Sequence, residues 1–170
     1  SRDDIVGELE RALPVLRKSG DDAALARALG LGGRLRFWRG HALDAGEDLW
    51  QAALLARGAG ARSEEAESLQ GVLGTILHGP MSASDGLNRI EEMRPRAARN
   101  GRLETSLLYI EGSLAAMHAD VDRARSAYSK AESIARDHGL ELLRARFAGR
   151  VLTAIGALEG RLPDGVKALR

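Results

Sequence analysis

The sequence predicts an all-α chain built from about four antiparallel helix pairs. Apolar residues recur with the period of an amphipathic helix through segments of about 15 to 20 residues. Strand-length runs of β-branched and aromatic residues are missing, and aromatic residues make up only 4% of the chain. Abundant Ala, Leu, Glu and Arg favour helices as well.

Eight helices and the start of a ninth are expected from this periodicity. The expected spans are 4–18, 21–39, 42–58, 63–78, 84–99, 103–118, 121–137 and 140–158, with the ninth beginning near Pro163. Glycine can adopt the left-handed conformation that ends a helix, and proline cannot continue one. The expected stops are therefore Gly20, Gly40, Gly60, Gly79-Pro80, Gly101, Gly139 and Gly160.

A pattern of small, small and large apolar residues recurs about every 40 residues, which indicates a repeat architecture. The copies begin at Gly33, Gly74, Gly112 and Thr153. In the first copy, Gly33 is followed by Ala45, Leu49 and Ala52. Small residues allow the two helices of a pair to approach closely, and the large residue fills the space between neighbouring pairs.

This spacing resembles the signature of the tetratricopeptide repeat (TPR), in which small residues occupy the eighth and twentieth positions and a large residue the twenty-fourth. The resemblance covers the chain from about Asp21 to Leu169 and implies a TPR-like superhelix (solenoid). Two features depart from the family: the period exceeds the usual length of about 34 residues, and Arg36 and Ala115 stand where an aromatic residue is normal.

We expect residues 1–170 to form a single TPR-like helical-repeat domain. The sequence ends inside its fourth repeat, and solenoids usually close with a polar capping element. We therefore expect a fragment of a longer chain. A short final helix lying across the end is the alternative.

A narrower resemblance lies between Leu54 and Met93, where a glycine-proline turn separates two helices. This segment resembles the C-terminal helical repeats of actinobacterial multidomain signalling proteins. In those proteins a nucleotide-cyclase or DNA-binding domain and a signal-transducing ATPase domain precede the repeats. The resemblance implies a non-catalytic interaction or regulatory module of a cytoplasmic signalling or transcription-regulating protein, whose ATPase or cyclase residues would lie outside this sequence.

Composition excludes several classes of site. The 25 Lys and Arg residues almost balance the 24 Asp and Glu residues, so no strong net field attracts nucleic acid or an anionic membrane. The absence of cysteine removes disulfides, thiolate zinc sites and cysteine nucleophiles. We expect a cytoplasmic protein without a cofactor, which binds a protein or peptide segment rather than nucleic acid or membrane.

No residue set predicts catalysis. The four histidines show no metal-binding spacing and fall near expected helix ends, where they suit the terminal carbonyls: His41, His78, His118 and His138. The glycines in GLGGRL, from Gly30 to Leu35, lack the spacing of a phosphate-binding loop and favour close helix packing. Five arginines surround one expected helix end and suit either an anionic partner or a solvated surface: Arg89, Arg94, Arg96, Arg99 and Arg102.

The TPR resemblance implies that the first helix of each pair lines a groove. A groove with arginine, hydroxyl and aromatic side chains suits a partner segment with acidic side chains. Phe37 and Phe147 could instead belong to the core, and Trp38 is expected to be a packing residue. The expected groove residues are Arg27, Arg34, Phe37, Thr75, His78, Ser106, Tyr109, Ser113 and Arg150.

Other functions stay open at this stage. A stand-alone scaffold could homodimerise through an uncapped end. A small-molecule sensor could hold its ligand between helices. An enzyme is the least favoured alternative, because no nucleophile, base and orienting group can be named together.

Overall fold

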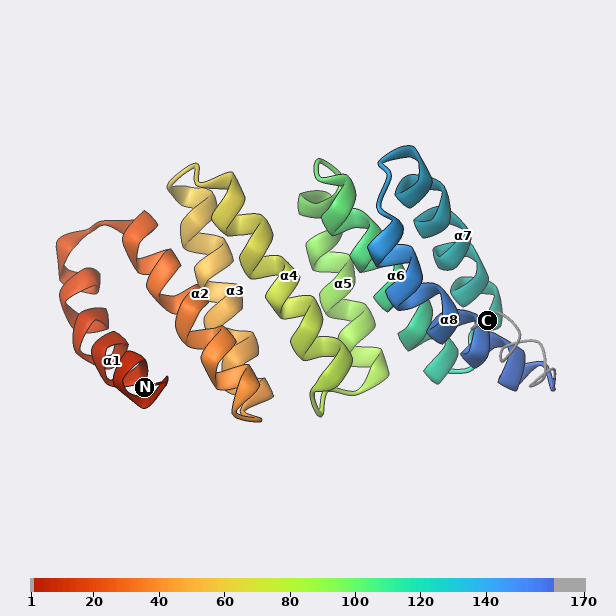
Figure 1. Cartoon of the computed structure of the whole chain (residues 1–170), viewed down its shortest axis with the longest axis horizontal. Helices are drawn as coiled ribbons and strands as arrows, with labels where there is room; N and C mark the ends of the chain where they lie inside the picture. The colour runs from red at the N-terminus through yellow and green to blue at the C-terminus, as the bar shows by residue number, and fades with distance from the viewer. Residues whose placement is uncertain (1, 161–170) are drawn as a thin grey trace. The chain divides into compact units, whose positions relative to one another are not determined.

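The computed structural model describes residues 2–160, without the side chains of residues 2–4 and of Ala148. This part of the chain is all α-helical, as predicted, and each helix bound lies within two residues of its expected position. The ninth expected helix lies outside the described residues. The helices in Figure 1 are α1 (Arg2–Ser19), α2 (Asp22–Trp38), α3 (Ala42–Gly58), α4 (Arg62–His78), α5 (Ala83–Ala97), α6 (Gly101–Met117), α7 (Val121–Asp137) and α8 (Glu141–Leu158).

The chain divides into two compact units, Ser1–Pro80 (unit 1) and Met81–Arg170 (unit 2). The division falls at the glycine-proline turn, between the two helices that the repeat pattern assigns to one pair. The single domain and the continuous solenoid therefore stay predictions, and each unit is described by itself. None of the described helices is long and apolar enough to cross a membrane.

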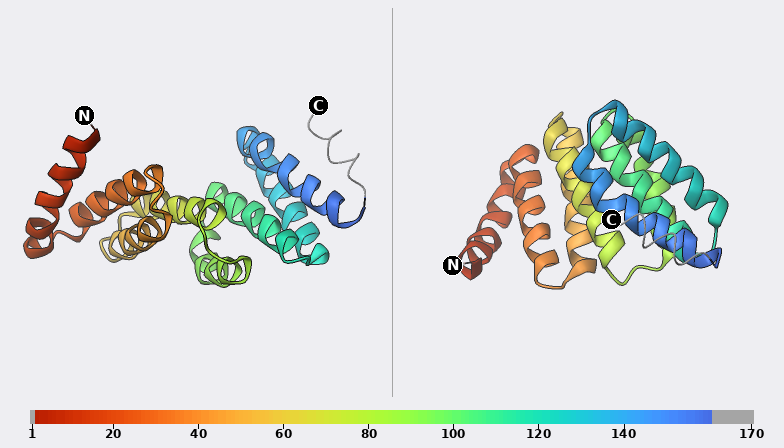
Figure 2. Two further views of the ribbon diagram at one scale, coloured as in Figure 1. Left: turned by 90° about the horizontal axis from the view of Figure 1, so that it is seen from below. Right: turned by 45° about the vertical axis from the view of Figure 1, so that its right-hand side comes forward.

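In unit 1, consecutive helices pack against one another, and α2 also contacts α4 (Figure 2). Leu25 and Leu29 of α2 form one cluster of the core with Ala52 of α3. Partly buried leucines of α1 and α3 complete this cluster: Leu13, Leu16 and Leu55. The apolar face of α1 is thus held against α2 by the burial of leucine side chains.

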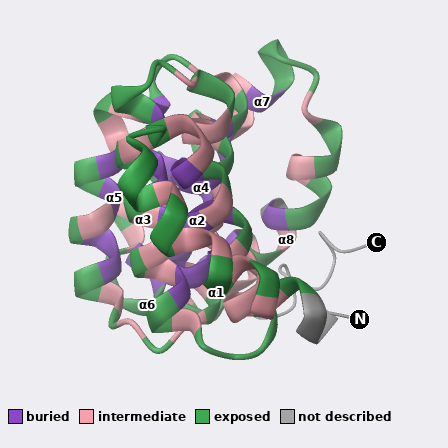
Figure 3. Ribbon diagram, turned by 90° about the vertical axis from the view of Figure 1, so that its left-hand side faces the viewer, coloured by how far each residue is buried: buried purple, intermediate pink, exposed green. Residues whose placement is uncertain are grey.

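In unit 2, α6 is the central helix. It contacts α5, α7 and α8, and every residue from Thr105 to Ala116 is buried. In contrast, exposed residues follow the outer faces of the surrounding helices, as the colouring in Figure 3 shows. Tyr109, Glu111 and Ser113 of this enclosed helix have hydrogen-bond partners inside the protein. No hydrogen bond is found for the buried hydroxyls of Thr105 and Ser106 in the described structure.

A regular turn separates the helices within each unit. The residue before the helix N-cap has positive φ in most of these turns, and glycine supplies it at Gly20, Gly40, Gly60 and Gly139. Ala119 occupies the same place before α7 with φ 59°. The prediction for Gly101 was wrong: this residue begins α6, and its Cα faces the ring of His138 so closely that a β-carbon would lie 2.6 Å away.

The small residues of the repeat mark close helix contacts in two of the four copies. A β-carbon on Gly33 would lie 2.7 Å from Cγ of Leu49 and 3.1 Å from the carbonyl oxygen of Ala45. A β-carbon on Gly112 would lie 3.3 Å from the carbonyl oxygen of Ala124. Around Gly74, by contrast, nothing in the described structure lies within 4 Å of that position. The Thr153 copy continues into residues outside the description.

Candidate partner-binding surface

In unit 1, α2 and α4, which are the first helices of the first two repeat copies, meet through small residues. A β-carbon on Gly30 would lie 3.4 Å from Oγ of Ser68, which is van der Waals contact, so the two helices approach closely at this glycine. Near one end of the contact, Nη1 of Arg27 lies 3.5 Å from Oε1 of Glu64. Near the other end, the rings of Phe37 and His78 have centroids 6.5 Å apart. Three of the expected groove residues, Arg27, Phe37 and His78, therefore border the contact between α2 and α4.

One exposed stripe follows α2. Its members stand at helical spacings of four, three and four residues, which place them on one face: Arg27, Leu31, Arg34 and Trp38. Leu31 is exposed although it is large and apolar, and Arg34 is partly exposed. The stripe therefore alternates guanidinium groups with apolar side chains.

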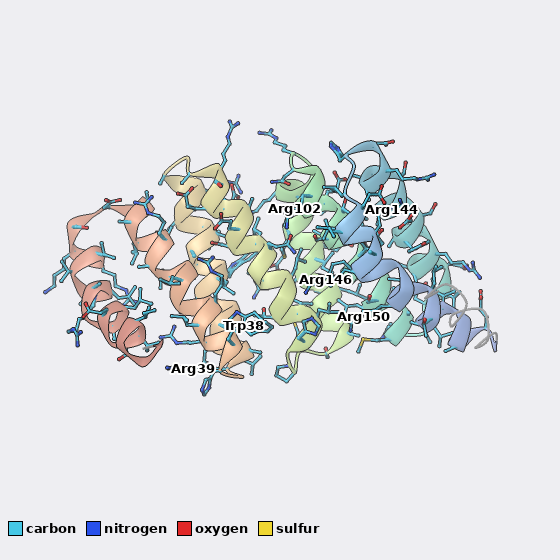
Figure 4. The ribbon with its side chains drawn as sticks, in the orientation of Figure 1. Trp38, Arg39, Arg102, Arg144, Arg146 and Arg150 are labelled. Atoms are coloured by element: carbon cyan, nitrogen blue, oxygen red, sulfur yellow. The ribbon has the colours of Figure 1, made fainter. Side chains whose placement is uncertain are left out.

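Trp38 was expected to pack inside the protein, and this prediction was wrong. Its side chain is 79% exposed at the C-terminal end of α2, where Figure 4 labels it. The Phe37 and Trp38 rings meet edge-on with centroids 6.2 Å apart. The helical spacing of Trp38 from Arg27 and Arg34 is the signal in the sequence that could have predicted its position on the stripe. We name the surface made by Arg27, Leu31, Arg34, Phe37, Trp38 and His78 the α2–α4 surface.

Four expected groove residues are buried and offer little surface to a partner. Thr75 donates its hydroxyl to the carbonyl oxygen of Val72 at 2.8 Å. In unit 2, Ser113 donates to the carbonyl oxygen of Tyr109 at 3.0 Å, and Ser106 is also enclosed in α6. The ring of Tyr109 stacks on Phe147 with centroids 5.6 Å apart. Phe147 thus belongs to the core, as the alternative interpretation held, whereas Arg150 of α8 is exposed.

A network of hydrogen bonds around Tyr109 joins α8 to α6 and α7. The hydroxyl of Tyr109 donates to Oε1 of Glu132 at 2.5 Å, and Arg144 donates to Oε2 at 3.1 Å. Burial raises the pKa of the Tyr109 hydroxyl, and the Glu132 carboxylate raises it further, because a tyrosinate there would lose both hydration and its hydrogen bond. This tyrosine is held protonated, which suits a structural donor.

Arg89 and Arg94, two of the five clustered arginines, form ion pairs within unit 2. Arg94 binds Glu91 at 2.9 Å and the buried carboxylate of Glu111 at 2.9 Å. Arg123 binds the same two carboxylates at 2.6 and 2.9 Å. The guanidinium hydrogen bond from Arg94 is the main cause of the lowered pKa of Glu91. These contacts join α5, α6 and α7, so Arg94 supports the packing of unit 2.

Three of the four histidines stand at helix C-termini, as expected, whereas His41 lies at a helix N-terminus and makes no side-chain cap hydrogen bond. His118 and His138 are the C-cap residues of α6 and α7, His41 is the N-cap of α3, and His78 ends α4. In the part of the chain that the structure describes, no group of three or more His, Asp or Glu side chains could hold a metal ion.

No protein-family model matches the sequence, and a search of curated proteins found no match.

Proposed function

We propose that this chain is a non-catalytic protein-interaction module and that a partner segment binds the α2–α4 surface of unit 1. The exposed Trp38 carries the proposal. Large aromatic side chains are costly to leave in water, and tryptophan and arginine are the residue types that contribute most to binding at protein interfaces. Trp38 shares its face of α2 with Leu31 and two arginines, which supplies both apolar anchors and charge on one stripe.

The stripe favours an acidic amphipathic segment as the partner. Arg34 has no carboxylate within ion-pair distance among the described residues, so its guanidinium is open to a ligand. Arg27 is only loosely paired, at 3.5 Å from Glu64. A partner helix with apolar residues every three to four positions and acidic residues beside them would match this spacing.

The narrower resemblance supports a regulatory role. In this proposal the chain is a sensor or autoinhibitory segment of a cytoplasmic signalling or transcription-regulating protein, and the partner can be another domain of the same protein. An immunoblot of source-cell lysate with an antibody to the chain tests this role. A band several times heavier than 18.2 kDa supports it, and a band at that mass removes it.

The binding surface is tested by affinity capture followed by reconstitution. The wild-type chain and the triple variant Arg27→Ala/Arg34→Ala/Trp38→Ala are immobilised, and captured proteins are purified and titrated calorimetrically against both. We expect the triple variant to lose the partner while it keeps its helicity and melting temperature, because all three side chains lie on the surface. The matched control is Leu43→Ala/Arg57→Ala, which removes an exposed leucine and an exposed arginine from α3. Equal affinity of the triple variant and wild type would refute the surface.

A further inference from the structure

An exposed basic row lies on α8 in unit 2 and shares no residue with the α2–α4 surface. It consists of Leu142, Arg146 and Arg150, which follow one another at intervals of four residues, about 6 Å along the helix axis. Leu142 is 89% exposed, and both arginines are exposed. Figure 4 labels Arg146 and Arg150 along α8.

A recess of about 400 Å³ lies beside the first turn of this row. Arg102 at the start of α6 and Arg146 of α8 both line it, so two guanidinium groups border one apolar hollow. Its apolar lining comes from Leu140, Leu142 and Leu143. Such a hollow accepts an apolar side chain, and the guanidinium groups can then bind carboxylates next to it.

Within residues 2–160, the arginines of this surface are not neutralised by carboxylates. Arg144, on the same helix, binds Glu132 at 3.0 Å and Glu141 at 2.7 Å. Among the described residues, no carboxylate lies within ion-pair distance of Arg102, Arg146 or Arg150. Glu141 is the one acidic residue that lines the described recess, and it is bound to Arg144. Arg146 also lies over the ring of Phe147, with Cζ 5.2 Å from the ring centroid, a contact that leaves its positive charge in place. Within the described part of the chain, the surface therefore presents three positive charges without a carboxylate partner around the exposed Leu142.

We propose that Arg102, Leu142, Arg146 and Arg150 form a second docking surface, which binds an acidic peptide segment with an apolar side chain between its carboxylates. This inference goes beyond the proposed function, because it uses other residues in another unit and can fail or hold independently. The partner needs acidic residues to complement the charge of the three arginines. It needs an apolar residue to fill the leucine-lined recess.

An acidic peptide fits these features better than an anionic polymer or a lipid surface. A phosphate backbone has no apolar side chain for the recess. Phe147, next to Arg146, is buried in the core, so it offers no face on which a nucleic-acid base could stack. Three arginines on a chain of net charge +1 also provide little of the long-range attraction that an anionic membrane requires.

The test uses a library of short random peptides displayed on phage, panned against the immobilised chain. We expect enrichment of sequences in which Asp or Glu flank Leu, Ile or Phe. One enriched peptide, labelled with a fluorophore, is then titrated by anisotropy. The variant Arg146→Gln/Arg150→Gln should weaken its binding by about tenfold or more, because it removes two charge-assisted contacts. Leu142→Ser should weaken it by a smaller factor.

The matched control is Arg99→Gln/Lys130→Gln, which removes two exposed positive charges elsewhere in unit 2. This control and the unit 1 variant Arg34→Ala/Trp38→Ala should bind the peptide as wild type does. Circular dichroism melts establish that all variants remain folded. The proposal is overturned if acidic sequences are not enriched, if the control loses as much affinity as Arg146→Gln/Arg150→Gln, or if phosphatidylserine vesicles or oligouridine displace the peptide more effectively than the unlabelled peptide does.

Discussion

Gly33 of α2 lies so close to Leu49 of α3 that a β-carbon on Gly33 would come within 2.7 Å of the leucine Cγ. Leu49 is buried and cannot swing into solvent, and the carbonyl oxygen of Ala45 stands 3.1 Å away on the same side. The contact is therefore possible only for glycine at this position. It joins the two helices that form the centre of unit 1.

The variant Gly33→Ala should destabilise unit 1 by about 1–2 kcal/mol. Overpacking a core costs about 1–3 kcal/mol, and the better helix propensity of alanine returns up to about 1 kcal/mol. Gly74→Ala is the matched control, because Gly74 is also inside a helix but has open space where its β-carbon would lie. That variant should be stabilised by up to about 1 kcal/mol. Urea unfolding measures the free energy of unfolding of both variants. A Gly33→Ala variant as stable as the wild type would contradict the close contact.

Ala119→Gly should stabilise unit 2 by up to about 1 kcal/mol. Ala119 has φ 59°, where the β-carbon of an L-residue is crowded, and glycine avoids this strain. The gain is limited because glycine also increases the entropy of the unfolded chain. The reverse change at the equivalent turn is Gly139→Ala, at φ 64°. It should destabilise unit 2 by about 1 kcal/mol. Thermal melts of the two variants should shift in opposite directions, and shifts of the same sign would argue against the assigned turn geometry.

Tyr109→Phe should destabilise unit 2 by about 1.5–3 kcal/mol, because it removes a hydrogen bond to the largely buried carboxylate of Glu132. Tyr128→Phe is the control. Tyr128 lies beside Tyr109, with ring centroids 6.2 Å apart, but no hydrogen bond of its hydroxyl is found in the described structure. It should therefore lose less than about 0.5 kcal/mol. A double-mutant cycle with Glu132→Gln isolates the coupling, and similar losses in the two phenylalanine variants would contradict the network.

Stability should fall as the pH rises above 10. Burial and then Glu132 raise the pKa of Tyr109 and Tyr128 above the ordinary value of 10.0. Above pH 10 the unfolded chain loses these phenolic protons while the folded protein keeps them, so deprotonation favours unfolding. The two tyrosines contribute their full stabilisation below pH 10. This stabilisation is lost as the pH rises from 10 through their raised pKa values. Urea midpoints measure this dependence, which Tyr109→Phe/Tyr128→Phe should reduce; an unchanged dependence would place its cause elsewhere.

Much of the local structure could be predicted because it depends on short-range chemistry. The amphipathic period gave the eight helices, and glycines with positive φ gave most of the turns. Asp21 was expected to begin a helix, and its carboxylate accepts the amide of Ala24 at 2.8 Å. Gly101 was misread as a helix end, since a glycine required by a distant ring looks the same in sequence as one required by a turn.

The exposed sites were harder to predict, because burial depends on which helices pack on each face. The rings of Phe37 and His78 lie with centroids 6.5 Å apart, whereas Tyr109 and Ser113 of α6 are buried in unit 2, where α8 packs on α6. Trp38 was assigned to the interior because aromatic side chains usually lie there, yet its face of α2 is left open.

The sequence by itself determined that the described chain is a series of helices with regular turns, because helix period, capping and glycine conformation act within a few residues. Only the tertiary structure decided that Gly33 and Gly112 mark close helix contacts whereas Gly74 does not. It also decided that Arg94 is held by Glu91 and Glu111, whereas Arg146 and Arg150 have no carboxylate partner among the described residues. The physical reason is that contact distances and charge pairing join residues far apart in the chain, and no local pattern encodes which of them will meet.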